Sequence, residues 1–347
     1  MEIGSEFWKC DENLIYDNSK TWNIGKDNRF TLSGRTAIQY VLENIQKNKI
    51  VKKAYLPSYC CDSMIEPFES MGIKVEFYNV SYNENLNYDI DLEKDIDLFF
   101  AMNYFGYSET NMDSFIKEFK KKGKIVIEDI THSIFSDKRY SEYSDYLVGS
   151  LRKWLPITSG GIAVNLNNNF ELDLKKETNY NMIAIKKMAM ENKKNYIEKT
   201  ENISKDLFLM QYHESDSVLD SDYENYSIDE ESLKIIMGID IKKIKNTRIQ
   251  NVKTIYEKLK NNTNINFLVN SYDEKDVLLF VPIIIPKEKR DRLRKFLIDN
   301  EVYLPVHWPL EKGINNIYNR ELSLVCDQRY NNLDISNYID LIIEYFN

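Results

Sequence analysis

Short apolar runs alternate with amphipathic stretches over residues 1–165. Apolar runs of about 4–8 residues, rich in β-branched and aromatic side chains, are typical of buried strands, whereas apolar residues three and four positions apart are typical of helices. Their alternation predicts an α/β fold in which helices cover a mostly parallel sheet. We expect strands at 52–56, 73–78, 97–103, 124–128, 146–149 and 161–166, and helices at 36–48 and 113–122.

The pattern changes after residue 175, where Lys, Glu, Asn, Asp and Ser become frequent. It predicts one long amphipathic helix, then an irregular acidic loop at 213–230, then a long helix at 231–261. A smaller α+β domain is expected to follow, with a strand at 277–285, a helix at 287–300, a short strand near 303–306 and a last helix at 335–345. We expect three parts: an N-terminal segment (1–24) that packs with the small domain, a large domain (25–240) and a small domain (241–347).

Composition and charge exclude several classes of protein. The chain has 347 residues, of which 43% are hydrophobic, enough for two domains with buried cores. Its net charge of -9 argues against a nucleic-acid binder, which needs a basic surface. No apolar run approaches the ~20 residues of a membrane helix, and the N-terminus has no cationic and apolar export signal. We therefore expect a cytoplasmic protein without a membrane partner.

The cysteines predict no metal site. Cys10, Cys60, Cys61 and Cys326 show no CxxC spacing, and adjacent cysteines such as Cys60 and Cys61 are poor disulfide partners. Reduced thiols are the expected state in a cytosolic protein.

Ligands of open α/β sheets bind beyond the carboxyl ends of the strands, so polar residues at those ends are candidates for function. Segment 33–36 (Ser-Gly-Arg-Thr) opens a predicted helix, whose N–H groups and positive end suit a phosphate, although Ser33 is equally suited to be a plain N-cap. Glu128 and Asp129 end a β-branched strand and point to opposite sides, so they do not form an acid–base pair. His132 follows three residues later, and either a structural or a functional role fits it.

Two further segments carry candidate chemistry. Lys153 follows a buried strand and is flanked by apolar residues; burial lowers the pKa of an amine and favours Schiff-base chemistry with a carbonyl, while a surface lysine is the alternative. His307 stands between Pro305 and Pro309, where it either faces a cleft or simply packs.

The order of these pieces resembles the fold type I pyridoxal-phosphate (PLP) enzymes, and within them the DegT/DnrJ/StrS family of nucleotide-sugar aminotransferases. The resemblance spans nearly the whole chain. It rests on the Ser-Gly turn at 33–34, Pro-Ser-Tyr at 57–59, the strand ending in Glu128-Asp129 with His132, Asn-Tyr-Phe-Gly at 103–106, Ser150-x-x-Lys153 with a Gly-Gly strand start, Arg248 and Tyr256-x-x-Leu259 on one helix, and Glu-Leu-Ser-Leu at 321–324. It implies a three-layer α/β/α large domain with a mostly parallel sheet and a smaller α+β C-terminal domain.

The resemblance also implies the site and its reaction. Lys153 would hold PLP covalently and move the substrate proton, and Asp129 would keep the ring nitrogen protonated. His132 would lie near the phenolic oxygen of the ring. The implied phosphate-binding residues are Gly34, Arg35, Thr36 and Ser150. Tyr104 and His307 are the expected substrate residues.

This chain departs from the family pattern in places. An arginine, Arg35, replaces the family's threonine in the phosphate turn and would bind either phosphate or substrate. Cys60 and Cys61 occupy the stretch where the family has its ring-stacking aromatic, and Tyr59 is the expected replacement. The family's Asn-Tyr-Arg segment, which contributes to the neighbouring subunit's site, is not recognisable at 225–228.

The resulting hypothesis is an aminotransferase that moves an amino group, with glutamate as donor, to a nucleotide-linked keto-sugar in surface polysaccharide or amino-sugar biosynthesis. The alternatives are another PLP reaction, such as a lyase or acyl transfer, and a non-catalytic ligand-binding relative. Related sugar dehydratases replace the lysine by histidine, so Lys153 argues against that variant. A homodimer with shared sites is expected, partly because Tyr104, Phe105 and Tyr107 cluster where a single chain has little to cover them.

Overall fold

The computed structural model describes the chain except residues 1, 10–21, 23, 138–139, 175 and 310–315. Cys10 lies outside the described residues. The chain divides into two compact units. Unit 1 comprises residues 1–5, 51–144 and 241–347, and unit 2 comprises residues 6–50 and 145–240. The division after residue 240 coincides with a predicted domain boundary; the other predicted boundaries stay a prediction.

Unit 1 contains the parallel part of the fold. Four of its strands pair in parallel in the order β7-β6-β3-β4, and β5 joins β4 as an antiparallel hairpin. All residues of β6 and β7 are buried, which explains their continuous apolar sequences. The elements are β3 (Lys53–Pro57), α2 (Asp62–Ser70), β4 (Lys74–Asn83), β5 (Asn85–Asp89), β6 (Leu98–Met102), the 3₁₀ turn η2 (Ser108–Thr110), α3 (Asp113–Lys121) and β7 (Ile125–Asp129).

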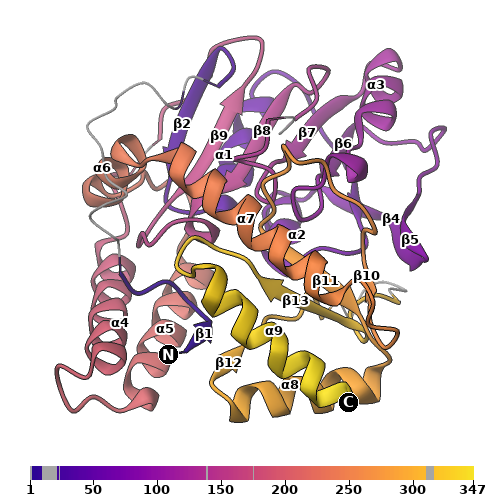
Figure 1. Ribbon diagram of the computed structural model, residues 1–347. Helices are drawn as coiled ribbons and strands as arrows, with labels where there is room; N and C mark the ends of the chain where they lie inside the picture. The colour runs from indigo at the N-terminus through magenta and orange to yellow at the C-terminus, as the bar shows by residue number, and fades with distance from the viewer. Residues whose placement is uncertain (1, 10–21, 23, 138–139, 175, 310–315) are drawn as a thin grey trace. The chain divides into compact units, whose positions relative to one another are not determined.

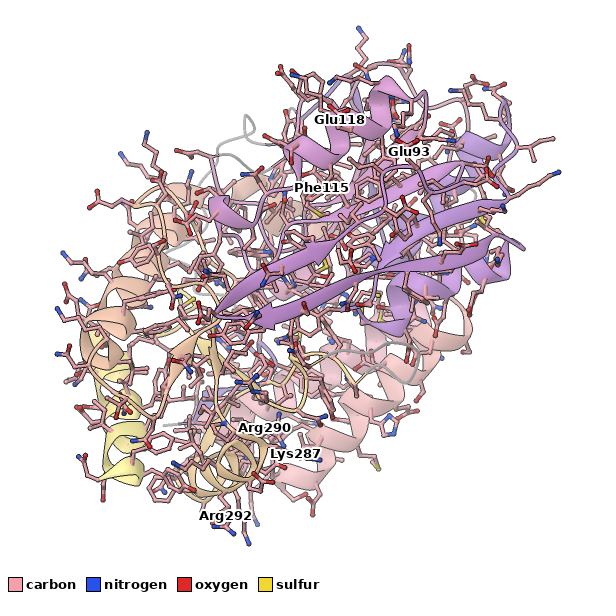
Figure 2. The ribbon with its side chains drawn as sticks, turned by 90° about the vertical axis from the view of Figure 1, so that its right-hand side faces the viewer. Glu93, Phe115, Glu118, Lys287, Arg290 and Arg292 are labelled. Carbon is pink, nitrogen blue, oxygen red and sulfur yellow. The ribbon has the colours of Figure 1, made fainter. Side chains whose placement is uncertain are left out.

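Helix α3 follows its predicted apolar pattern. Ile116 and Phe119 are fully buried, and the Phe119 ring stacks on Phe99 of β6 at 4.3 Å between centroids. Phe115 is half-buried and meets Tyr88 edge to face, while Glu118 lies one turn further along the helix (Figure 2). The amphipathic spacing thus buries one face of α3 against the sheet.

The C-terminal part of unit 1 is a second α+β layer. A three-stranded antiparallel sheet has the order β10-β11-β13, and α7 packs against α9 beside it (Figure 1). The elements are α7 (Ile241–Leu259), β10 (Asn266–Phe267), β11 (Phe280–Ile284), α8 (Lys287–Asp299), β12 (Val302–Tyr303), β13 (Glu321–Val325) and α9 (Asn332–Phe346). At the other end of the chain, β1 (Ile3–Gly4) pairs in parallel with β12.

Unit 2 combines a short antiparallel sheet with helices. Its strands have the order β2-β9-β8, and α1 packs on β8 and β9. The elements are β2 (Asp27–Thr31), α1 (Gly34–Gln46), β8 (Tyr146–Ser150), the 3₁₀ turn η3 (Leu151–Lys153), β9 (Gly161–Asn165), α4 (Tyr180–Glu198), α5 (Lys205–Ser221) and α6 (Glu230–Gly238). Helices α4 and α5 form the antiparallel pair in Figure 1.

Two predictions about residues 175–261 are wrong. Much of the expected acidic loop belongs to α5, because Phe208, Tyr212 and Leu219 form a buried stripe that the surrounding polar residues conceal. The expected single helix at 231–261 is two helices, because Ile239 has an extended backbone (φ -77°, ψ 139°) and its side chain is buried. Periodicity alone does not reveal a two-residue break between two helical stretches.

No helix in the described part of the chain is long and apolar enough to cross a membrane.

Candidate functional site

The predicted phosphate turn lies at the start of α1 in unit 2. Ser33 is the N-cap: its Oγ accepts the Thr36 N–H at 3.2 Å. Thr36 in turn donates its hydroxyl to the Tyr223 carbonyl at 2.8 Å, so this side chain supports the turn from behind. Because the first N–H groups of a helix are not used within it, the amides of Gly34 and Arg35 are the donors that this turn offers to an anion.

Two glycines let three segments meet at this turn. A Cβ on Gly34 would lie 3.1 Å from the Cβ of Ser150, the last residue of β8, and one on Gly161 would lie 2.0 Å from the Ser33 carbonyl oxygen. Larger residues would push the turn away from the strand ends. Ser150 therefore packs directly against Gly34.

Arg35 is directed toward α5. Its Nη2 donates to Asp220 at 2.8 Å, and its guanidinium lies over the Tyr223 ring at 5.2 Å. The Arg35 side chain is only 10% exposed in this arrangement. It therefore joins α1 to α5.

Lys153 is the last residue of η3 and its side chain is exposed, so the expectation of a buried lysine is wrong for this chain. The 3₁₀ turn directs Leu151, Trp154 and Leu155 into the core, each with an exposed fraction of 0%, and leaves Lys153 on the opposite side. The apolar neighbours that suggested burial are buried themselves.

In unit 1, the two carboxylates that end β7 have different environments. Glu128 is 1% exposed and accepts hydrogen bonds from Asn103 Nδ2 (2.7 Å), Ser141 N (2.9 Å) and Ser144 Oγ (2.6 Å). Burial raises the pKa of the Glu128 carboxyl to about 7. Asp129 is also buried, and its Oδ1 accepts the Thr131 N–H at 2.7 Å. Glu128 thus holds the 141–144 loop, whereas Asp129 belongs to the segment that leads to His132.

His132 is buried, and its Nδ1 accepts the backbone N–H of Phe105 at 2.9 Å. An accepting Nδ1 carries no proton in the neutral ring, so the proton is on Nε2. The Trp308 ring lies parallel to the imidazole at 5.6 Å between centroids and Phe105 packs at 5.0 Å. His132 is therefore a fixed imidazole that presents Nε2–H as a donor.

Tyr59 and Tyr104 form a buried pair next to these rings. Their rings stack at 5.4 Å, the Tyr104 hydroxyl donates to the Tyr59 carbonyl at 2.5 Å, and Trp308 meets Tyr59 edge to face. The Tyr59 hydroxyl is buried and has no hydrogen-bond partner among the described residues. The structure thus packs Tyr59 against other aromatics, and its role as the residue that stacks on the cofactor ring stays a prediction.

The aromatic cluster is covered within one chain. Tyr104, Phe105 and Tyr107 have exposed fractions of 0%, 0% and 2%, and the Tyr107 hydroxyl contacts that of Tyr256 at 3.0 Å. The expectation that a single chain has little to cover this cluster is wrong, because residues of the C-terminal part of unit 1 already cover it.

His307 lies near the same cluster. Its ring is 5.7 Å from that of Phe105 and 5.0 Å from that of Trp308. Its Nδ1 is 3.0 Å from Ser323 Oγ, and its backbone N–H donates to Glu321 at 2.7 Å. Trp308, Ser323 and Glu321 were not identified from the sequence as site residues. Trp308 could have been identified from its position next to His307 and before Pro309.

Each unit, taken by itself, offers donors that suit one part of PLP. Unit 2 offers helix N-terminal amides and the Ser150 hydroxyl, which suit a phosphate. Unit 1 offers a buried carboxylate, an Nε2–H donor and the buried Tyr59 hydroxyl, which suit a heterocycle with a basic nitrogen and an oxygen. No cluster of metal ligands occurs among the described residues.

No protein-family model matches the chain, and neither does any curated protein. Solved structures do match. The aminotransferase PseC from Helicobacter pylori, involved in pseudoaminic acid biosynthesis, is 13% identical with a TM-score of 0.65, over 100% of this chain and 99% of that one. The aminotransferase TlmJ from Streptoalloteichus hindustanus is 12% identical with a TM-score of 0.65, over 92% and 85%. The chain has the fold of these aminotransferases.

A third similar structure is that of a dehydratase. The E. coli GDP-4-keto-6-deoxy-D-mannose-3-dehydratase, which holds hydrated PLP, is 14% identical with a TM-score of 0.60, over 93% of this chain and 88% of that one. The predicted fold class, a fold type I PLP transferase fold with a mostly parallel sheet, is confirmed. The aminotransferase fold therefore accommodates more than one reaction on sugars, and the side chains decide between them.

Proposed function

We propose that this protein is a PLP-dependent aminotransferase that transfers an amino group from glutamate to a keto-sugar, nucleotide-linked, in amino-sugar or surface polysaccharide biosynthesis. The observation that carries the proposal is the presence, on an aminotransferase fold, of an accessible lysine after β8 and a buried aspartate at the end of β7. PLP supplies an electron sink for the amine-bearing carbon. The residues of the chain bind it and move protons.

In unit 2, Lys153 would bond to the aldehyde carbon of the cofactor and later carry the proton to and from the substrate carbon. The Gly34 and Arg35 amides and the Ser150 hydroxyl would bind the phosphate. Thr36 would hold the turn in place through the hydrogen bond from its hydroxyl to the Tyr223 carbonyl. The contact of Gly34 with Ser150 supports this assignment.

In unit 1, Asp129 would keep the ring nitrogen protonated, since a carboxylate in a desolvated site stabilises a neighbouring positive charge. His132 would donate Nε2–H to the phenolic oxygen, and the Tyr59 hydroxyl would find its partner in the ligand. Tyr104 holds Tyr59 through its hydrogen bond to the Tyr59 carbonyl, and a contact of Tyr104 with the substrate stays a prediction. We propose that His307 contacts the substrate.

A lyase or dehydratase reaction is the second candidate, favoured by the dehydratase with this fold. Lys153 argues against the dehydratase, since related sugar dehydratases carry a histidine at this position, and it leaves the lyase open. A non-catalytic ligand-binding protein would need neither Lys153 nor Asp129.

The direct test is the absorbance of the purified protein with PLP. A yellow protein that sodium borohydride bleaches supports a lysine-bound cofactor. Incubation with glutamate should convert the yellow form to the amine form of the cofactor, and a nucleotide-linked keto-sugar should restore it. A protein that binds PLP but shows no change with any amino donor would contradict an aminotransferase and favour the lyase.

We also propose that the active form is a cytoplasmic homodimer whose subunits share their sites. The support is the resemblance to fold type I enzymes, since the aromatic cluster no longer supplies any. Sedimentation at micromolar concentration, together with an activity assay on each fraction, tests it. A fully active monomer would exclude shared sites.

A further inference from the structure

Glu321, Ser323 and His307 form a chain of hydrogen bonds in unit 1. Glu321 and Ser323 are neighbours on the same face of β13, and both side chains are fully buried. The Ser323 hydroxyl donates to Glu321 Oε1, and Ser323 Oγ lies 3.0 Å from His307 Nδ1. Glu321 Oε2 accepts the His307 backbone N–H at 2.7 Å. These hydrogen bonds therefore hold both the ring and the backbone of His307.

These hydrogen bonds determine which nitrogen of His307 carries the proton. A hydroxyl has one hydrogen, and that of Ser323 is used on Glu321. Ser323 Oγ is therefore an acceptor toward His307, and Nδ1 must be the donor. The neutral imidazole then has its lone pair on Nε2, the opposite of the tautomer that the Phe105 N–H imposes on His132.

Glu321 is held independently of His307. Arg290, labelled on α8 in Figure 2, donates to the Glu321 carbonyl at 3.1 Å and to the Tyr318 carbonyl at 3.2 Å. Among the described residues, the other groups packed on the imidazole are the uncharged rings of Phe105, Phe280 and Trp308. Glu321 lies 3.7 Å from His307 Nδ1, and among the described residues it is the one carboxylate in contact with this ring.

We propose that Glu321 and Ser323 are positioning residues that hold His307 as the Nδ1–H tautomer, so that Nε2 accepts a hydrogen bond from a substrate hydroxyl. The identity of the substrate rests on the proposed function; the tautomer does not. A lone pair on Nε2 attracts hydroxyl donors and repels phosphate and carboxylate oxygens. His307 thus selects the polyhydroxylated part of a keto-sugar, while the anionic groups bind elsewhere.

Histidine tautomers are measurable in this protein because it has only three histidines, His132, His213 and His307. Long-range ¹H–¹⁵N correlation spectra of ¹⁵N-histidine-labelled full-length protein, with signals assigned from His213→Gln and His307→Gln, distinguish the two tautomers. We expect Nδ1–H for His307 and Nε2–H for His132. An Nε2–H tautomer at His307 in the wild-type protein would overturn the proposal without any variant.

Ser323→Ala tests the cause. We expect His307 to lose its single tautomer while His132 keeps its own and so reports an intact fold. Ser144→Ala is the matched control, because Ser144 is also a buried serine that donates to a buried glutamate, Glu128, but contacts no histidine in the described part of the chain. A His307 that keeps Nδ1–H in Ser323→Ala would overturn the role of Ser323.

Kinetics test the consequence for the substrate. With glutamate and GDP-4-keto-6-deoxy-D-mannose or its uridine and thymidine counterparts as probes, Ser323→Ala should raise KM for the sugar at least tenfold and change kcat less. An unchanged KM in a variant with an altered tautomer would contradict the substrate contact. A wild-type protein inert toward all probes would count against the proposed function, whereas the spectra would still decide the positioning.

Discussion

The backbone N–H of Phe105 donates to Nδ1 of His132 across 2.9 Å. Phe105 adopts a φ of 58°, a left-handed conformation that is uncommon for a bulky residue, and Gly106 follows with a φ of 95°. Backbone strain of this kind costs of order 1–3 kcal/mol and persists only where surrounding contacts enforce it. Here the strained turn fixes a histidine at the end of the segment that carries Asp129.

Replacing Gly106 by alanine should be far more destabilising than a positive φ alone explains. The new Cβ would lie 2.6 Å from the His132 carbonyl oxygen and 2.7 Å from that of Val277, and neither backbone can move freely. Gly123→Ala is the control, because Gly123 has a φ of 72° and nothing within 4 Å. Urea unfolding should show a loss of about 1–2 kcal/mol in the free energy of unfolding for Gly123→Ala. The loss for Gly106→Ala should be clearly larger. Equal losses would contradict the close packing of the 103–106 turn.

Lys153→Ala should fold normally and lose both the covalent link to the cofactor and turnover. Lys153 is exposed, so its removal leaves no cavity. Mass spectrometry after borohydride reduction of the wild-type protein should place the cofactor mass on the peptide that contains Lys153. Lys26→Ala, another exposed lysine of unit 2, should keep the link and the activity. Cofactor mass on Lys124 or any other lysine would refute the assignment.

Asp129→Asn should keep the fold and bind cofactor but lose most activity. The amide oxygen can still accept the Thr131 N–H that now bonds to Oδ1 at 2.7 Å, yet a neutral amide cannot hold the ring nitrogen protonated. A charge-assisted hydrogen bond contributes about 1.5–3 kcal/mol, so kcat should fall at least tenfold. Turnover close to that of the wild-type protein would exclude this role for Asp129.

The buried Glu128 carboxyl should make stability depend on pH. Burial raises its pKa from 4.5 to about 7, so the native state binds this proton more tightly than the unfolded chain. The stabilisation is fully present below pH 4.5 and is lost as pH rises through 7, with a slope of up to about 1.4 kcal/mol per pH unit.

Unfolding free energies of the wild-type protein and Glu128→Gln, measured from pH 4.5 to 8, check this expectation. The free energy of the wild-type protein should fall relative to that of the variant as pH rises. Glu142→Gln, which changes an exposed carboxyl in the loop that Glu128 holds, should run parallel to the wild-type protein. If the free energies of Glu128→Gln ran parallel to those of the wild-type protein, the Glu128 carboxyl would not titrate between pH 4.5 and 8.

The local pattern of the chain determined most of its strands and helices. The apolar runs at β3, β6, β7, β8 and β9 are buried strands, and α1, α3, α8 and α9 lie where apolar spacing placed them. Burial of a continuous apolar run or of one helix face is a local requirement, so the sequence expresses it directly. The order of polar residues at the strand ends was likewise enough to indicate a PLP fold, which the structural comparisons confirm.

Tertiary structure alone decided which side chains point where. Lys153 is exposed because a 3₁₀ turn directs its apolar neighbours inward, and α5 is a helix because its buried stripe packs on α4. The tautomer of His132 depends on a backbone amide 27 residues away, and that of His307 on a serine 16 residues further along. Contacts between distant residues leave no periodic trace in the chain, since each depends on a path through space that the intervening residues do not encode locally.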